Sequence, residues 1–137
     1  MIVYVDTSIL IRRLMGEPNA YPLSQCRAIL TSEITRIESL RAIDRLRIEA
    51  RWAAAMVMER IRVLTASMAL LREVPLQPPI LRRAAEPFPT IIKTLDALHV
   101  ATALLVSMQM KQPCTFLTHD RRQGIAAQTV GLLADGF

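Results

Sequence analysis

Short apolar runs alternate with segments of helical spacing, and this alternation limits the possible folds most strongly. Runs with the length of buried strands cover residues 2–6, 28–31, 72–76, 114–118 and 130–133. Segments with helical spacing or apolar helical character cover residues 9–15, 22–27, 32–47, 49–64, 80–85, 94–110 and 121–128, and residues 66–71 either extend the 49–64 helix or form a turn. Because strands that alternate with helices form mostly parallel sheets covered on both faces, we expect an α/β fold.

The length of 137 residues fits one domain, residues 1–137, and no repeat or linker divides it. No apolar run is long enough to cross a bilayer, and the first residues predict a strand and not a signal peptide, so we expect no membrane association. Cys26 and Cys114 lack metal-binding spacing and are expected to be reduced thiols in a cytoplasmic protein.

The chain is basic, with 17 Lys and Arg against 12 Asp and Glu and a net charge of +5. Fifteen of the basic residues are Arg, which makes bidentate contacts with phosphate. This balance favours a polyanionic partner such as nucleic acid or an acidic protein tail. A GC-rich genome that encodes Arg in place of Lys would produce the same composition, and composition does not separate the two.

Four acidic residues stand in separate, largely apolar stretches: Asp6, Glu38, Asp96 and Asp120. Asp6 and Asp120 each end a predicted strand, at the edge where open α/β sheets bind ligands. Asp96 lies in the first turn of an apolar helix, and Glu38 lies on the helix that begins near residue 32. Carboxylates gathered at one point repel each other without a cation, and Mg²⁺ or Mn²⁺ suits oxygen ligands.

Each acid also has a purely structural interpretation. Asp6 and Asp120 are suited to capping the helices that follow them. Asp96 complements a helix dipole. Glu38 has Arg41 and Arg45 within reach on its own helix. Taken singly, these interpretations are favoured over a site.

One further glutamate and the two histidines are also candidates for the site. Glu33 lies about 140° around the helix from Glu38, so both cannot face one site, and we assign Glu33 to solvent. His99 is expected to be a core histidine bonded to a neighbour, and His119 to lie at a strand end near the site.

Four ordered motifs resemble those of the PIN-domain family, in the style of VapC toxins of bacterial toxin–antitoxin pairs. They are Asp6-Thr7-Ser8, Ser32-Glu33-Ile34-Thr35-Arg36-Ile37-Glu38, Leu95-Asp96-Ala97-Leu98-His99-Val100-Ala101 and Leu117-Thr118-His119-Asp120. Each motif is weak alone, but their order over nearly the whole chain is specific. Gln123 departs from the family pattern, which often has an aromatic or aliphatic residue there, and is expected to affect packing more than chemistry.

The resemblance implies a PIN-like three-layer α/β/α fold with a mostly parallel sheet of four to five strands. It implies a Mg²⁺- or Mn²⁺-dependent endoribonuclease, a homodimer, and a cognate antitoxin protein that neutralises it. Asp6, Glu38, Asp96 and Asp120 match the family's acidic quartet, as catalytic residues and metal ligands. Thr7, Ser8 and Thr118 match hydroxyl positions beside it, in contact with substrate or supporting the ligands.

In the expected mechanism, one or two ions held by the quartet activate water for attack on an RNA phosphodiester. The segments around the site carry candidate phosphate contacts: Arg12, Arg13, Arg36, Arg121 and Arg122. A PIN-like module that binds RNA or protein without cutting is the alternative.

Dehalogenase-type phosphotransferases need a second Asp where Ser8 stands, and dinucleotide-binding domains need a Gly-rich turn that is missing. A receiver domain needs an acidic pair at the first strand, which this chain also lacks.

Overall fold

The structure is a computed structural model that describes residues 1–137, and its centre is a sheet of five parallel strands. The strands are β1 (Ile2–Val5), β2 (Ala28–Ser32), β3 (Arg72–Val74), β4 (Cys114–Leu117) and β5 (Leu133–Asp135), in the spatial order β3-β2-β1-β4-β5. All four strand pairs are parallel, so every strand ends at the same edge of the sheet. The expected α/β class and parallel sheet are confirmed.

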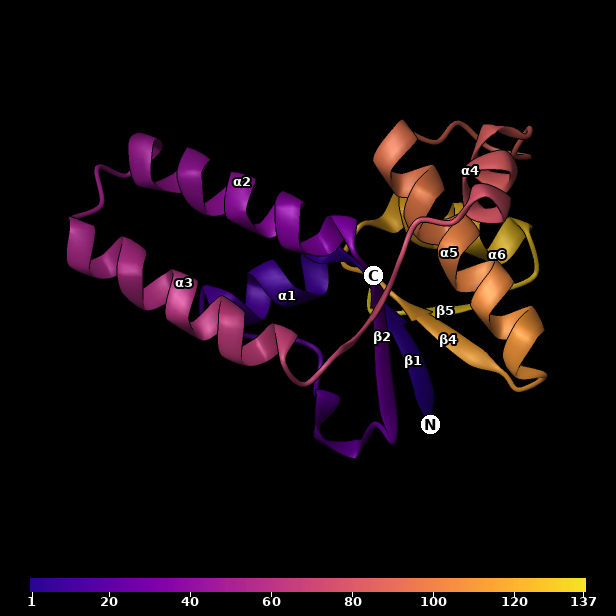
Figure 1. The fold of residues 1–137 in the computed structure, drawn as a ribbon, viewed down its shortest axis with the longest axis horizontal. Helices are drawn as coiled ribbons and strands as arrows, with labels where there is room; N and C mark the ends of the chain where they lie inside the picture. The colour runs from indigo at the N-terminus through magenta and orange to yellow at the C-terminus, as the bar shows by residue number, and fades with distance from the viewer.

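Six helices cover the two faces of this sheet (Figure 1). They are α1 (Thr7–Leu14), α2 (Ile34–Glu49), α3 (Ala54–Met68), α4 (Pro78–Ala85), α5 (Thr94–Met110) and α6 (Arg121–Thr129), with a short 3-10 turn at Leu23–Gln25. The first three helices lie on one side of the sheet and the last three on the other. The three-layer α/β/α arrangement expected from the sequence is therefore present.

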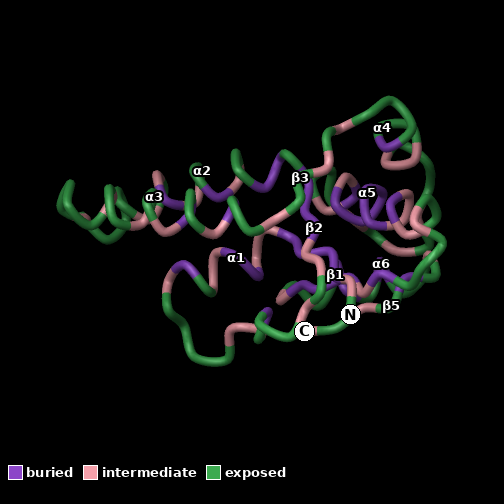
Figure 2. The backbone as a smooth tube through the Cα atoms, turned by 60° about the horizontal axis from the view of Figure 1, so that its bottom comes forward, coloured by how far each residue is buried: buried purple, intermediate pink, exposed green.

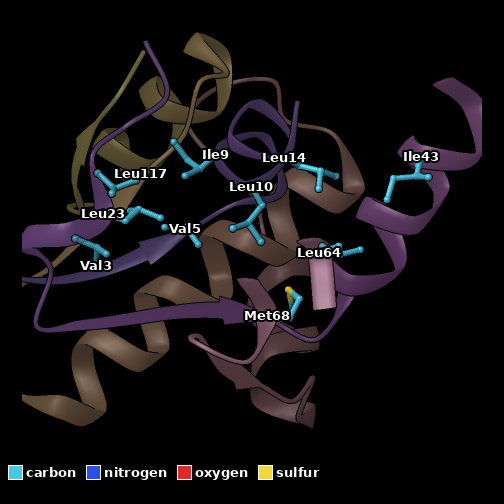
Figure 3. Packing of buried hydrophobic residues seen from close by; sticks show 10 residues of the cluster. All are labelled: Val3, Val5, Ile9, Leu10, Leu14, Leu23, Ile43, Leu64, Met68 and Leu117. Carbon is cyan, nitrogen blue, oxygen red and sulfur yellow. The ribbon is translucent and has the colours of Figure 1, made fainter. Parts of the chain in front are cut away.

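The core has two halves because side chains on a strand point to alternate faces. Val3 and Val5 of β1 pack with α1, α2 and α3, as Figure 3 shows. Tyr4, between them, belongs to the other half together with Phe116 and buried residues of α5 and α6. The outer part of the α2–α3 hairpin extends beyond this core and is mostly exposed (Figure 2).

Three element boundaries differ from the sequence expectation. A break between helices was expected between residues 47 and 49, but α2 continues to Glu49, the chain turns at Arg51 with φ of 51°, and α3 begins at Ala54. The end of α3 at Met68 agrees with the extension considered for residues 66–71. The last strand was expected at 130–133, but Gly131 turns the chain with φ of 90° and β5 begins at Leu133. Helix α4 begins at Pro78 and not at residue 80 as expected. Proline is tolerated there because the N–H groups of the first helical residues have no partner within the helix.

Both cysteines are free thiols, as expected. None of the helices has the length and apolar character needed to cross a membrane.

Candidate functional site

The pairing of β1 with β4 places Asp6 and Thr118 side by side at the sheet edge. Val5 is in register with Leu117, and the Asp6 amide donates a hydrogen bond to the Leu117 carbonyl at 3.1 Å. The Thr118 hydroxyl then donates to Asp6 Oδ2 at 2.8 Å. Both side chains are buried, so this bond holds a carboxylate inside the fold.

Asp6 is also the N-cap of α1, as its structural interpretation predicted. Its Oδ1 accepts hydrogen bonds from the Ile9 amide at 3.3 Å and the Ser8 hydroxyl at 2.6 Å. Burial raises the pKa of this carboxyl above its ordinary value, although the bonds from Ser8 and Thr118 oppose that rise. A carboxylate with this environment is costly to ionise unless a cation lies near it.

Asp120 caps α6 at the end of β4. Its Oδ1 accepts from the amides of Arg122 at 2.8 Å and Gln123 at 3.2 Å, and its own amide donates to Thr118 Oγ1 at 2.9 Å. No protein donor reaches Oδ2 of Asp120. One oxygen is therefore used for the helix cap, and the other is available for a ligand.

Asp96 lies in the first turn of α5 and lines the same cavity as Asp120. This cavity has a volume of about 850 Å³, and Lys93, Arg121 and Arg122 also line it. Burial raises the pKa of Asp96, and the negative charges of Asp120 and Asp6 raise it further, against the opposing effects of His99 and Lys93. Asp96 is thus close enough to Asp120 and Asp6 for their negative charges to act on it.

Glu38 approaches this edge from α2 and is held by two side chains. Thr7 Oγ1 donates to Glu38 Oε1 at 2.6 Å, and His99 Nε2 lies 2.7 Å from the same oxygen. Burial acts to raise the pKa of Glu38, but the bonds from His99 and Thr7 outweigh it and leave the pKa below its ordinary value. The pairing with Arg41 or Arg45 suggested by the sequence does not form.

The four predicted acids share one edge of the sheet without closing on a single point. No three of the His, Cys, Asp and Glu side chains are arranged so that they could hold one metal ion together. The carboxylate oxygens at this edge are ligands that a hard divalent cation prefers, and the pKa of Asp96, raised mainly by burial, is raised further by the negative charges of Asp120 and Asp6. Asp6 and Asp96 carry the charge that such a cation would neutralise.

Gln123 is a member of this site that the sequence analysis assigned to packing. The side chain is 2% exposed, its Oε1 lies 3.1 Å from Thr118 Oγ1, and its Nε2 is buried without a hydrogen-bond partner. Thr118 has one hydroxyl proton, and the Asp6 carboxylate is the stronger and nearer acceptor. The Gln123 oxygen therefore gains no proton from Thr118, whereas an amide turned by 180° would donate from Nε2 to Thr118 Oγ1 and leave Oε1 as the buried atom without a partner. Its only sequence signal was a departure from the family pattern.

His99 and His119 both lie beside the acids. His99 is buried and bonded, as expected, but its partner Glu38 was not foreseen. The His119 amide donates to the Ser8 hydroxyl at 2.8 Å, and its Nδ1 lies 2.7 Å from the Gly136 carbonyl. Glu33 is exposed, as expected, and its carboxylate accepts from the Leu76 amide at 2.6 Å.

The five candidate arginines divide between the site and the rest of the surface. Arg121 and Arg122 line the cavity of Asp96 and Asp120. Arg12 lines a smaller hollow with Ser8 and Asp120 and pairs with Glu17 at 3.4 Å. Arg36 pairs with Glu73 at 2.6 Å, and Arg13 lines a separate cavity with residues of α3.

The family model of the PIN domain matches residues 3–127. A curated relative, "Ribonuclease VapC47" of Mycobacterium tuberculosis (strain CDC 1551 / Oshkosh), is 28% identical and covers 96% of this chain and 94% of its own. The structure of VapBC2 from Rickettsia felis, bound to a DNA fragment from their promoter, matches with a TM-score of 0.71 and 15% identity over 98% of both chains. VapC20 of Mycobacterium tuberculosis, described as a sarcin-ricin loop cleaving toxin, matches with a TM-score of 0.64 and 15% identity over 96% of both chains.

Proposed function

The chain belongs to the PIN domain family, and from this premise we propose that it is a metal-dependent endoribonuclease and the toxin of a toxin–antitoxin pair. The observation that carries the proposal is the gathering of Asp6, Asp96 and Asp120 at the carboxyl edge of a parallel sheet, beside a cavity lined by cationic side chains. The names of VapC47 and VapC20, a ribonuclease and a cleaving toxin, support the same reaction class.

We propose that Asp6, Glu38, Asp96 and Asp120 hold Mg²⁺ or Mn²⁺. When bound, such an ion supplies Lewis-acid activation of water and neutralises charge on the phosphodiester. Thr118 and Ser8 fix the Asp6 carboxylate, and Thr7 fixes Glu38. These three hydroxyl residues act as supports of the ligands in this proposal.

The cations around the cavity are proposed to hold the RNA backbone. Lys93, Arg121 and Arg122 line it together with Asp96 and Asp120, so phosphate groups would lie between the positive side chains and the acids. The net charge of +5 agrees with a polyanionic substrate.

The remaining parts of the proposal concern assembly and location. We propose that residues 1–137 act as one domain, that the protein forms a homodimer in the cytoplasm, and that a cognate antitoxin protein neutralises it. The match to a chain of VapBC2 supports an antitoxin partner.

A non-catalytic PIN-like module that binds RNA or protein is the second candidate. One observation favours it: the acids do not form a ready-made site for an ion. Binding of RNA without turnover, with Mn²⁺ present, would support this candidate over the nuclease.

The deciding experiment is cleavage of a panel of single-stranded RNA and transfer RNA by purified protein without antitoxin. Reactions contain Mg²⁺, Mn²⁺ or EDTA. The variants are Asp6→Asn and Asp96→Asn, and Asp44→Asn is the matched control because Asp44 pairs only with Arg41 and Arg47 on α2. We expect metal-dependent cleavage by wild type and the control, and none by the two site variants. Cleavage that survives both site substitutions would refute the quartet mechanism.

A further inference from the structure

A chain of buried polar groups leads from the interior of the sheet to Glu38. The Tyr4 hydroxyl lies 2.9 Å from His99 Nδ1, and His99 Nε2 lies 2.7 Å from Glu38 Oε1. Tyr4 is 0% exposed and His99 is 2% exposed. Buried polar groups are costly without partners, so these bonds must be formed for the fold to tolerate the two side chains.

For a neutral His99 imidazole, counting protons fixes the direction of each bond. An ionised carboxylate only accepts, so the Nε2 atom of His99 must carry the hydrogen that reaches Glu38. Nδ1 of a neutral imidazole is then an acceptor, and the Tyr4 hydroxyl is its donor. Tyr4 therefore selects the tautomer of His99 that bonds to Glu38.

Packing keeps Tyr4 in place for this task. Its ring stacks on Phe116 with centroids 5.6 Å apart and planes 11° apart, and it meets the His99 ring edge to face at 5.9 Å. Tyr4 belongs to strand β1, and Asp6 follows two residues after Tyr4, directly behind the end of the strand. The donor is thus fixed on the same rigid strand that ends at the acids.

The bonds to Glu38 all meet one of its oxygens. Thr7 donates to Oε1 at 2.6 Å, and His99 reaches the same atom, while Oε2 accepts no hydrogen bond from the protein. Two donors on one oxygen fix the rotation of the carboxyl group and leave the other oxygen for a ligand. Glu38 also lines a cavity of about 600 Å³ with Leu95, next to Asp96 in the chain.

We propose that Tyr4 and His99 are positioning residues, which orient Glu38 so that its Oε2 is presented to a divalent cation at the acidic edge. The inference rests on the proposed function for the identity of that ligand. Neither residue touches RNA or reacting atoms. Removal of a residue that hydrogen-bonds to a metal ligand changes metal affinity or activity by roughly 10- to 100-fold.

The test measures Mn²⁺ affinity by calorimetry, without RNA, together with kcat and KM for cleavage. His99→Leu removes the donor to Glu38, and we expect it to weaken Mn²⁺ binding by about 10- to 100-fold. His99→Gln keeps an N–H group near the Nε2 position and should restore most of the affinity. In cleavage, the loss is expected in kcat and not in KM, because the cationic side chains that bind RNA are unchanged.

Tyr4→Phe provides the sharper variant because it removes one hydroxyl and keeps the stacking on Phe116. We expect it to weaken Mn²⁺ binding severalfold in the wild-type background and to have no effect in the His99→Gln background, where no tautomer needs to be selected. An equal effect in both backgrounds would overturn the inference. Wild-type affinity in folded His99→Leu protein would also overturn it.

The outcomes separate this inference from the proposed function. If wild type binds Mn²⁺ but cleaves no RNA, the nuclease proposal fails and the binding data alone decide the roles of Tyr4 and His99. If wild type binds no Mn²⁺, the positioning inference fails as well. Thermal unfolding of each variant shows whether a loss of binding follows from a loss of fold.

Discussion

The Thr118 hydroxyl lies 2.8 Å from Asp6 Oδ2, although 112 residues separate them in the chain. The parallel pairing of β1 and β4 creates this contact, since Val5 and Leu117 are partners in register. Thr118 also accepts from the Asp120 amide, so one hydroxyl joins the ends of two neighbouring strands. The Thr118 side chain therefore bonds to both acids, the carboxylate of Asp6 and the amide of Asp120.

Thr118→Val should destabilise the protein more than Gln123→Leu. The first substitution leaves the buried Asp6 oxygen without its donor, and we expect a loss of about 1–3 kcal/mol in the free energy of unfolding. The second removes an amide that already has one unpaired atom, so its cost should stay below about 1 kcal/mol. Urea unfolding of both variants measures the difference, and the reverse order would refute the proton count at Thr118.

The stability of metal-free protein should fall as pH rises because of Asp6. Burial raises its pKa in the fold above the ordinary value of 3.8, so the unfolded chain loses this proton first. Between the pKa of Asp6 in the unfolded chain and its higher pKa in the fold, the folded state binds more protons than the unfolded state. The free energy of unfolding therefore falls as pH rises through this range, until the folded carboxyl has also ionised. Asp6→Asn, which does not titrate, should remove this part of the pH dependence.

Urea unfolding in EDTA between pH 4 and 8 tests this expectation. The variant keeps an amide oxygen to accept from Ser8 and Ile9, so the helix cap is retained. Curves for wild type and Asp6→Asn that run parallel throughout this range would contradict it.

Mn²⁺ should stabilise the folded protein, and Asp96→Asn should abolish the effect. A ligand that binds only the folded state adds about 2.7 kcal/mol at a concentration 100-fold above Kd. Removing Asp96 takes away a carboxylate whose pKa, raised mainly by burial, is raised further by Asp120 and Asp6. Thermal unfolding with and without Mn²⁺ measures the shift, and Asp44→Asn should retain it. A full shift in Asp96→Asn would exclude Asp96 as a ligand.

Gly124→Ala should stabilise the fold when Phe137 is replaced by alanine, and should stabilise it less or destabilise it when Phe137 is present. A Cβ atom at position 124 would overlap the Phe137 ring, so the ring must move. In Phe137→Ala protein the ring is gone, and alanine in α6 should stabilise by about 1 kcal/mol through helix propensity alone. The same substitution with Phe137 present should gain less or lose. Equal effects in denaturant unfolding would mean that the ring does not pack on α6.

Local patterns in the sequence predicted the parts of the site that local structure determines. Asp6 and Asp120 follow buried strands, and the parallel sheet brings strand ends to one edge, so their proximity follows from the fold class. Both also cap the next helix, because a carboxylate at that position accepts from the first amides of the helix.

Contacts between distant helices were beyond sequence reasoning. Glu38 and His99 are 61 residues apart on α2 and α5, and nothing in either helix indicates how the two lie against each other. The break between α2 and α3 was expected between residues 47 and 49, before its actual position at Arg51, because no Gly or Pro marks the turn and the surrounding residues favour helix on both sides. Gln123 was expected to affect packing because the sequence showed only a departure from the family pattern, whereas its contact with Thr118, directly after β4, appears only in the fold.

The parallel sheet makes the two ends of the chain unequal as places for a fused reporter. Strand β1 starts directly after Met1, at the edge opposite the acids, whereas β5 ends at Asp135 on the acidic edge. The carbonyl of Gly136 bonds to His119, so a tag attached behind Phe137 would emerge beside Asp120 and add its own charges there. A fluorescent or purification tag placed before Met1 would leave the acidic edge clear. Binding assays on this protein should therefore use a tag at the N-terminus.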